Sequence, residues 1–329
     1  MKIALDAMGG DFAPKVPVAG AIEALEDLPA SCEILLVGRT ADIKAALKEH
    51  GGERPRLTIV EAPEVVDMAD KPLAAVRGKP NSSIAIGLGL HKKGEAQAFI
   101  SAGNTGAVMA ASTLLLRLHN GVDRPAIGTM FPTMGKPVLV MDAGANVDCS
   151  ARELAGFAAI GAVYARDVMG RAEPAVGLLN IGEEQEKGNA AVKEAHNLLL
   201  HSTAFRFVGN VEGRDILGGV CDVVVCDGFV GNVLLKFYES VSKLICELMT
   251  REMDPGFMKM PGMQNVMRTL DYSEIGGAPL LGVRGVSIIC HGRSTPRAIR
   301  NAIKVARTAV DSNLSQHIGA EFAGDGAAV

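Results

Sequence analysis

Short runs of β-branched and aliphatic residues recur along this chain, and most are followed by a turn rich in Gly, Asp or Asn and then by a helical pattern. Continuous apolar runs predict strands buried on both faces, and their alternation with helices predicts a parallel sheet covered on both sides. We therefore expect one α/β domain, residues 1–329, with a Rossmann-like, mostly parallel sheet. The runs are Ile3–Leu5, Glu33–Val37, Leu57–Val60, Ala98–Ile100, Val138–Met141, Val176–Leu179, Phe205–Val208, Asp222–Val225 and Val286–Ile289.

The turns that follow these runs are the most informative part of the sequence. Open α/β sheets bind ligands beyond the carboxyl ends of their strands, and glycine there lets backbone N–H groups approach an anion. One such turn is ordinary turn chemistry, but seven along one sheet edge predict a binding site. The turns are Asp6–Asp11, Ser101–Gly106, Asp142–Asn146, Asn180–Glu183, Gly209–Gly213, Asp227–Asn232 and His291–Ser294.

One segment, residues 233–275, departs from this alternation. Apolar residues at helical spacing predict a helix over Val233–Glu252, which the sequence Asp254-Pro-Gly256 then ends. A second helical run extends from Gln264 to about Leu270. We expect an inserted helical hairpin that projects from the sheet and carries a methionine-rich tip.

Charge, cysteine usage and absent motifs exclude several classes of protein. The net charge of −4 disfavours a nucleic-acid-binding protein, and six scattered cysteines without zinc spacing favour reduced thiols in a cytosolic protein that holds no metal. The opening MKIALDAMGGD has no signal-peptide core, and Gly106–Leu116 is too short to cross a bilayer. No dinucleotide-binding glycine motif, P-loop or serine-hydrolase elbow is present. A noncanonical nucleophile would be Ser101 or Cys149, for which a turn hydroxyl and a packed thiol are the favoured interpretations.

Seven stretches, spread over almost the whole chain, resemble the bacterial phosphate acyltransferases of phospholipid synthesis. The resemblance implies transfer of a fatty acyl group from acyl carrier protein (ACP) to inorganic phosphate, giving acyl phosphate, with no cofactor. It also implies a fold similar to phosphate acetyltransferases and isocitrate-dehydrogenase-like enzymes, and a cytoplasmic homodimer that touches the inner face of the cell membrane reversibly. The stretches are DAMGGD (6–11), SAGNTGA (101–107), DAGAN (142–146), LLNIGEEQEKGN (178–189), GNVEGRD (209–215), CDGFVGNVLLK (226–236) and GGAPLLGVRGVSIICHG (276–292).

Two residues are the leading catalytic candidates. Phosphate is already an anionic nucleophile, so the reaction needs a cation that holds it and donors that stabilise the oxyanion. Lys187, shortly after the run that ends at Leu179, is our first choice for the cation, although a lone lysine in a charged run is usually solvated. Asn232 is the candidate oxyanion donor, and it is equally suited to cap the helix that it opens.

Other residues of the strand-end turns are candidate substrate contacts of lower rank. Amide and hydroxyl groups could contact phosphate or pantetheine, and carboxylates could orient these donors, although all are also good turn formers. His291 could protonate the leaving thiolate, but a hydrogen-bonded structural histidine is the favoured interpretation. The remaining candidates are Asn104, Thr105, Asn146 and Asn189 as contacts, and Asp6, Asp11, Asp142 and Asp227 as orienting groups.

Two surfaces could serve macromolecular partners. Arg297, Arg300, Lys304 and Arg307 fall on one helical face and could steer the acidic carrier protein, although a solvated face is favoured. Four apolar residues of the hairpin tip need a partner: the bilayer, the acyl chain, the other subunit or the chain's own core. Lys259 beside them favours an anionic membrane surface. The four are Phe257, Met258, Met260 and Met263.

Three other functions remain open at this point. A dehydrogenase would need a nicotinamide site and usually a metal-binding carboxylate set, and neither is evident in the sequence. A phosphate acyltransferase that uses coenzyme A instead of a carrier protein would have a similar fold. A non-catalytic, membrane-associated acyl-binding protein would bind acyl chains but release no acyl phosphate.

Overall fold

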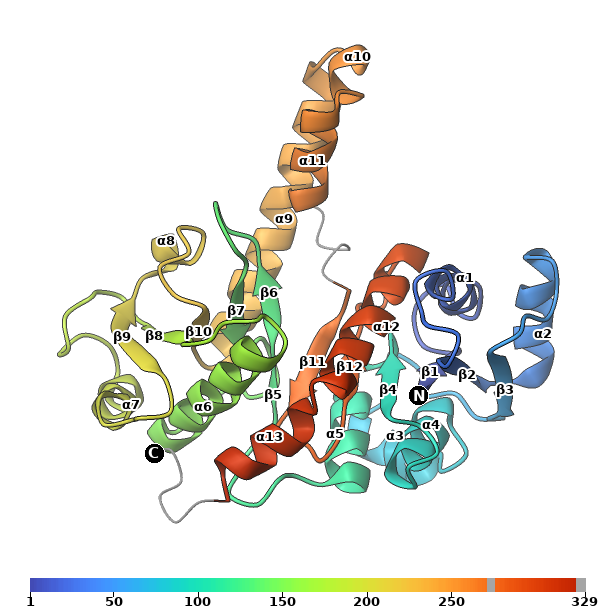
Figure 1. Ribbon diagram of the computed structural model, residues 1–329, viewed down its shortest axis with the longest axis horizontal. Helices are drawn as coiled ribbons and strands as arrows, with labels where there is room; N and C mark the ends of the chain where they lie inside the picture. Colours follow the sequence, from blue (N-terminus) through green and yellow to red (C-terminus); the bar gives the residue numbers. More distant parts are fainter. Residues whose placement is uncertain (271–275, 324–329) are drawn as a thin grey trace.

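The computed structural model describes residues 1–270 and 276–323, and its strands form two sheets instead of one (Figure 1). The seven-stranded sheet has the order β3 (Leu57–Glu61), β2 (Glu33–Gly38), β1 (Lys2–Asp6), β4 (Ala98–Ser101), β12 (Ser287–Ile289), β11 (Ala278–Leu281) and β5 (Ala126–Ile127). The five-stranded sheet has the order β6 (Thr129–Phe131), β7 (Val138–Met141), β10 (Val223–Val225), β8 (Ala175–Leu179) and β9 (Arg206–Val211).

Strand pairing is mostly parallel in both sheets, which confirms the predicted fold class. β3, β2, β1, β4 and β12 pair in parallel, as do β7, β10, β8 and β9. The exceptions are β11, antiparallel to β12 and β5, and β6, antiparallel to β7. The expectation of one continuous sheet edge is wrong, because the chain passes from one sheet to the other between β5 and β6. The seven turns are therefore divided between two edges.

Helices cover both sheets and build the core between them. α6 (Ala151–Asp167) is buried along most of its length and packs on β7, β8 and β10. α12 (Pro296–Asp311) packs on α1 (Lys15–Ala24), and residues of both sheets join the same apolar cluster. The other helices of the body are α2 (Thr40–Glu49), α3 (Pro72–Gly78), α4 (Ser83–Lys92), α5 (Thr105–Leu116), α7 (Ala190–Leu200), α8 (Gly213–Ile216) and α13 (Leu314–Glu321).

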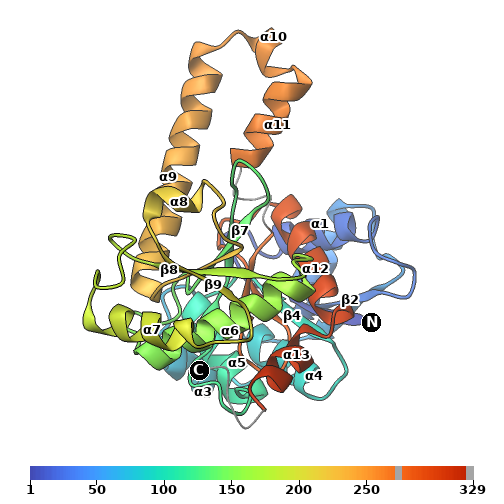
Figure 2. The same ribbon diagram turned by 60° about the vertical axis from the view of Figure 1, so that its left-hand side comes forward.

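The segment of the expected hairpin forms an arm that projects from the body (Figures 1 and 2). α9 (Gly228–Glu252) has 25 residues, which corresponds to about 37 Å of helix. α10 (Pro255–Met258) turns the chain at the tip, and α11 (Pro261–Leu270) runs back beside α9. Neither α10 nor α11 contains a buried residue. The end of the expected hairpin, residues 271–275, lies outside the described residues.

Candidate functional site

The first turn of α9 is docked on the loop that follows β7. The Gly228 N–H donates to the Asn146 carbonyl at 2.7 Å, and a Cβ at Gly231 would lie 1.9 Å from the Asp142 carbonyl oxygen. Only glycine permits this approach of helix and loop. The chain therefore brings together two of the expected turns, Asp142–Asn146 and Asp227–Asn232, at one end of the five-stranded sheet.

Asp142 is the hydrogen-bond centre of this junction. Its buried carboxylate accepts five hydrogen bonds, from the backbone N–H groups of Ile127, Gly144, Ala145 and Asn146 and from the Asn146 side chain. Burial raises the pKa of Asp142, while these bonds act in the opposite direction. The Asn146 amide also donates to the Pro125 carbonyl at 2.8 Å. Both side chains are therefore committed to holding the loop.

Asn232 lies inside α9 and does not cap it, so the expectation of a cap at this residue is wrong. The cap is Asp227, whose carboxylate accepts from the Val230 N–H at 2.8 Å, because α9 begins at Gly228 and already includes both glycines that precede Asn232. Asn232 is exposed, and a Cβ added at Gly144 would lie 3.5 Å from its side chain. Among the described residues its amide makes no hydrogen bond. It is a free polar group beside the loop after β7.

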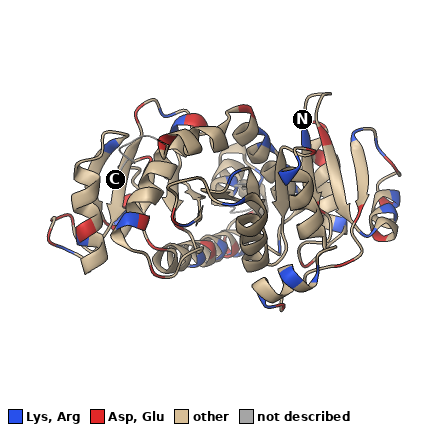
Figure 3. Cartoon of the chain, turned by 90° about the horizontal axis from the view of Figure 1, so that it is seen from below, with Lys and Arg blue, Asp and Glu red and all other residues tan. Residues whose placement is uncertain are grey.

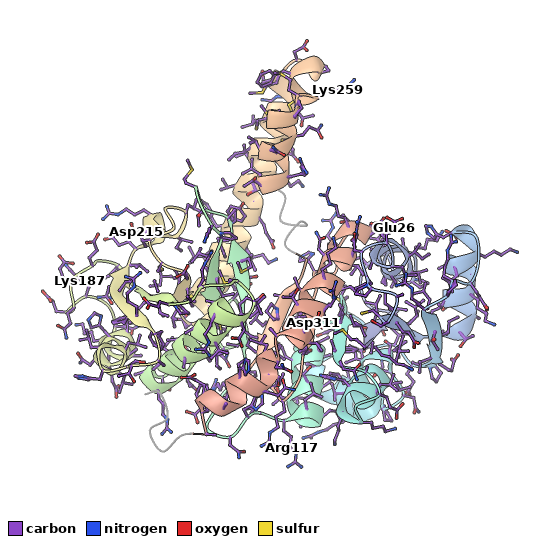
Figure 4. All side chains as sticks on the ribbon, viewed as in Figure 1. Glu26, Arg117, Lys187, Asp215, Lys259 and Asp311 are labelled. Atoms are coloured by element: carbon purple, nitrogen blue, oxygen red, sulfur yellow. The ribbon has the colours of Figure 1, made fainter. Side chains whose placement is uncertain are left out.

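Lys187 lies on the loop between β8 and α7, at the outer side of the five-stranded sheet (Figure 4). It is exposed, and within residues 1–270 and 276–323 its ammonium group has no ion-pair or hydrogen-bond partner. No hydrogen bond joins it to Asn232 in that part of the chain. Asn189, next on this loop, is occupied as the cap of α7 and accepts from the Val192 N–H at 2.9 Å.

The loops of the seven-stranded sheet use their polar side chains to hold the backbone. The buried Asp6 carboxylate accepts from the Ser101 hydroxyl at 2.6 Å and from the Met8 N–H at 3.0 Å, and burial raises its pKa. Asn104 caps α5 through the Ala107 N–H, and its amide donates to the carbonyls of Asp67, Met68 and Asp70. Asp6, Ser101 and Asn104 therefore anchor the loops after β1 and β4.

Three further candidates lie near the ends of β1, β4 and β12. The Asp11 N–H donates to the Gly292 carbonyl at 2.7 Å, which ties the loop after β1 to the loop after β12. His291 is exposed, and its Nδ1 accepts from the Arg293 N–H, which leaves the proton of the neutral ring on Nε2. Thr105 opens α5 and is exposed.

A cavity of about 190 Å³ joins His291 to the arm. Arg293, Ser294 and Glu239 are among the residues that line it. Sequence reasoning missed Glu239, which lies seven residues after Asn232 and hence on the same helical face of α9, two turns further along. This spacing could have identified it. The cavity shows that elements following strands of both sheets meet in one place.

Cys149 and two other buried or half-buried thiols are not activated nucleophiles. Burial raises the pKa of Cys149 to about 12, and burial also raises the pKa values of Cys221 and Cys290, to about 11 and about 12. A thiol with such a pKa is not a thiolate at neutral pH. Ser101, the other candidate nucleophile, donates its hydroxyl hydrogen to Asp6 and accepts from the Gly103 N–H. Both groups have the structural roles that the sequence favoured.

Comparison with known proteins gives the family. A family described as "Fatty acid synthesis protein" matches residues 1–317. Phosphate acyltransferases from Nostoc punctiforme and Heliobacterium modesticaldum are 48% and 50% identical, over 98% and 97% of this chain and 96% and 98% of their own lengths. The chain belongs to the phosphate acyltransferase family. The resemblance inferred from the seven sequence stretches is confirmed, and this family is one of transferases.

Solved structures agree on the fold of this acyltransferase. The EutD phosphotransacetylase from Staphylococcus aureus and a phosphotransacetylase from Streptococcus pyogenes each superpose with a TM-score of 0.64, over 94% of both chains. Their sequence identities are 14% and 16%, so the likeness concerns the fold alone. It confirms the expectation of a phosphate acetyltransferase-like architecture.

The expected carrier-binding side chains of the acyltransferase lie on α12. Arg300 and Lys304 both pair with Asp27, at 2.5 and 2.8 Å, and hold the pKa of that carboxyl well below its usual range. Arg307 pairs with Asp311 on its own helix at 3.1 Å. Acidic and basic residues are interspersed over the whole molecule (Figure 3). Asp27 could not have been foreseen, because 273 residues separate it from Arg300.

The tip of the arm is exposed and does not pack into the body, so core packing is the wrong interpretation of it. Phe257 and Met260 keep 45% and 52% of their surface accessible, and Met258 and Met263 are partly exposed. Lys259 lies at the far end of the arm (Figure 4). In the part of the chain that the structure describes, no helix is both long and apolar enough to span a bilayer, and no cluster of side chains is arranged to hold a metal.

Proposed function

We propose that this enzyme transfers a fatty acyl group from acyl-ACP to inorganic phosphate and releases acyl phosphate for glycerophospholipid synthesis. One observation carries the assignment of the site. Most of the polar candidates at the strand ends are bonded to the protein's own backbone, whereas the side chains of Lys187 and Asn232 are exposed and make no such bonds to the described residues. In a member of the phosphate acyltransferase family, a free cation and a free amide beside the strand ends suit an anionic nucleophile and an oxyanion.

The proposed reaction is a direct displacement. A phosphate oxygen attacks the thioester carbonyl carbon, the C–S bond breaks, and the carrier leaves as a thiol once its sulfur gains a proton. Lys187 holds the phosphate and Asn232 donates to the oxyanion that develops. The leaving sulfur takes the proton that hydrogen phosphate loses on attack, and His291, whose neutral ring carries its one proton on Nε2, is the candidate hydrogen-bond donor to that sulfur. Phosphate itself is the nucleophile, so no acyl-enzyme is needed.

Hydroxylamine trapping tests this reaction directly. The full-length protein is incubated with palmitoyl-ACP and phosphate, and acyl phosphate is captured as the hydroxamate. Product that requires both phosphate and the carrier-bound donor supports the proposal. Equal or faster turnover with palmitoyl-CoA would identify a coenzyme A-dependent phosphate acyltransferase. Bound acyl chains without any hydroxamate would identify the acyl-binding alternative.

A second copy of the chain is the proposed partner of α9. Five apolar residues lie along one stripe of this helix, at spacings of four, four, seven and four, and all are exposed. Phe237 is the most exposed of the five, with 68% of its surface accessible. An apolar stripe of this length on an isolated chain marks an interface, and the same stripe on a second copy is self-complementary in a two-fold dimer. The stripe consists of Phe229, Val233, Phe237, Leu244 and Leu248.

The tip is the proposed membrane contact of a cytoplasmic enzyme. A long-chain acyl phosphate is sparingly soluble, so delivery at an anionic bilayer surface suits the product, and a short apolar tip with one lysine should bind weakly and reversibly. The test is co-sedimentation with phosphatidylglycerol vesicles. Phe257→Asp/Met260→Asp should lose binding, whereas Val266→Asp, an exposed apolar residue further down α11, should retain most of it. Equal binding by the tip variant, folded and dimeric, would contradict this role.

A further inference from the structure

The backbone around Lys187 is fixed by two asparagine side chains. The Asn180 Nδ2 donates to the Lys187 carbonyl at 3.0 Å, and its Oδ1 accepts from the Ile181 N–H. The Asn210 Nδ2 donates to the Glu184 carbonyl at 2.8 Å. That carbonyl also accepts from the Lys187 N–H at 3.1 Å, closing a turn. Both ends of the turn over residues 184–187 are therefore held by amides from outside it.

A bulge in β9 aims Asn210 at this turn. Val176 of β8 pairs with Phe207, but Leu178 pairs with Asn210, so β9 has one residue more than β8 over this stretch. Gly209, with φ of +92°, lies in the bulge. One extra residue moves every later side chain to the opposite face of a sheet. Asn210 thus shares the face of Phe207, which α7 covers.

His196 on α7 sets the orientation of the Asn210 amide. Its Nδ1 lies 3.0 Å from the Asn210 Oδ1, which can only accept, so the ring proton is on Nδ1. The His196 ring meets the edge of Phe207 with centroids 5.2 Å apart. Both His196 and Asn210 are buried. The Oδ1 of the amide is thereby taken by the histidine, and the Nδ2 must face Glu184.

We propose that Asn210, oriented by His196, acts with Asn180 as a positioning residue for phosphate binding by Lys187. This inference rests on the proposed role of Lys187. A lysine ammonium on a four-carbon stem is a mobile point charge, so only a fixed backbone keeps it where phosphate must bind. The bulge, the buried histidine and the two amides supply that fixed backbone without touching the substrate. Misplacing a binding group by about 1 Å can cost up to about 100-fold in rate.

The test compares Asn210→Ala and Asn180→Ala with Gln185→Ala. Gln185 lies in the same turn, and its exposed amide donates to the Asn197 side chain, so this bond involves no backbone group of the turn. We expect the two asparagine variants to raise the KM for phosphate between about tenfold and 100-fold per folded molecule, with the KM for acyl-ACP unchanged. Hydrogen exchange of the amides at 184–187 should accelerate in both. Gln185→Ala should behave as wild type.

The outcomes separate this inference from the proposed function. A purely structural role would lower the Tm of Asn210→Ala but leave its phosphate KM, corrected for folded protein, at the wild-type value, and that result would overturn the inference. Lys187→Ala is assayed alongside. If it is inactive while both asparagine variants have wild-type kinetics, the proposed role of Lys187 is supported and the positioning role of the asparagines is contradicted. If Lys187→Ala has wild-type kinetics, both the proposed role of Lys187 and the positioning role are contradicted.

Discussion

Two kinds of strand-end loop occur in this molecule, and they differ in what their polar side chains do. In the loops after β1, β4 and β7, Asp6, Asn104 and Asp142 accept or donate hydrogen bonds to the surrounding backbone and are buried. In the loop after β8 and the second turn of α9, the side chains of Lys187 and Asn232 are exposed, and among residues 1–270 and 276–323 they have no hydrogen-bond partner. Similar sequence patterns thus build either an anchor or a binding group, and only the free groups can meet a substrate without breaking the fold.

Removing an anchor should have the largest effect on stability. Asp142→Ala would leave several buried N–H groups without an acceptor, so we expect a loss of more than about 3 kcal/mol in the free energy of unfolding. Urea unfolding followed by circular dichroism measures it. Asp148→Ala, an exposed aspartate of the same segment, should stay within about 0.5 kcal/mol of wild type. Comparable stability of the two variants would contradict the anchoring role.

Reversing charges on α12 should have a smaller effect than removing Asp142, and this effect should appear in the KM for acyl-ACP. Arg297→Glu/Arg307→Glu should raise the KM for acyl-ACP on the order of tenfold and flatten its salt dependence, with the phosphate KM unchanged. Asp27→Asn should do the opposite and lower the acyl-ACP KM, because it releases Arg300 and Lys304 from their shared partner. Steady-state kinetics at low and high salt measure both. Acyl-ACP kinetics that match wild type in both variants would leave α12 a solvated face.

A smaller effect is expected in the dependence of stability on pH, through the partly buried residue His91. His91 hydrogen-bonds the Ala96 carbonyl through Nδ1 and accepts from the Val286 N–H through Nε2, so it must be neutral. Burial lowers the pKa of His91 from its ordinary 6.5. The unfolded chain therefore takes up this proton at a higher pH than the folded protein. Stability should be complete above about pH 6.5 and fall below it by at most about 1.4 kcal/mol per pH unit.

The pH effect is measured by urea unfolding at pH 7.5 and 5.5. The variant His91→Gln should be less stable than wild type at pH 7.5 but lose less stability between the two values. His119, whose pKa burial also lowers, is present in both proteins and cancels in the comparison. Identical losses in wild type and variant would show that His91 does not couple folding to pH.

The sequence predicted the parallel strands and the arm better than the arrangement of the sheets. Long buried runs such as Glu33–Val37 carry a clear signal, whereas β5 and β6 have only two and three residues. β6 pairs antiparallel with the next strand, β7, but β5 pairs antiparallel with β11, which comes from far along the chain. Local patterns do not contain that pairing, so two sheets looked like one. The start of α9 was missed because Gly228 and Gly231 resemble a turn, although they serve the close contact with the loop after β7.

For the candidate site, the sequence identified the residues but did not show which of them anchor the loops and which are free to bind a substrate. Asn104, Asn146 and Asn232 are indistinguishable as letters in Gly-rich turns, and only the folded backbone shows which amides are occupied. Asn210 was expected in the turn Gly209–Gly213, but it lies within β9, and its direction depends on a one-residue bulge that the sequence pattern does not reveal. The position of Lys187 after a strand was the reason to expect a binding role for it and not that of an ordinary solvated lysine. In the described part of the chain its ammonium group is unpaired.

The most direct test of the distinction between free and anchoring side chains compares variants of both groups in one assay. Lys187→Ala and Asn232→Ala should each lose on the order of 100-fold or more in hydroxamate formation from acyl-ACP and phosphate, as expected for one preorganised group, with Tm values near wild type. Asn104→Ala should instead lower the Tm while each folded molecule keeps a near-normal phosphate KM, and Lys193→Ala, an exposed lysine on α7, should change neither. Near-normal turnover of both Lys187→Ala and Asn232→Ala would contradict the account and place the chemistry elsewhere.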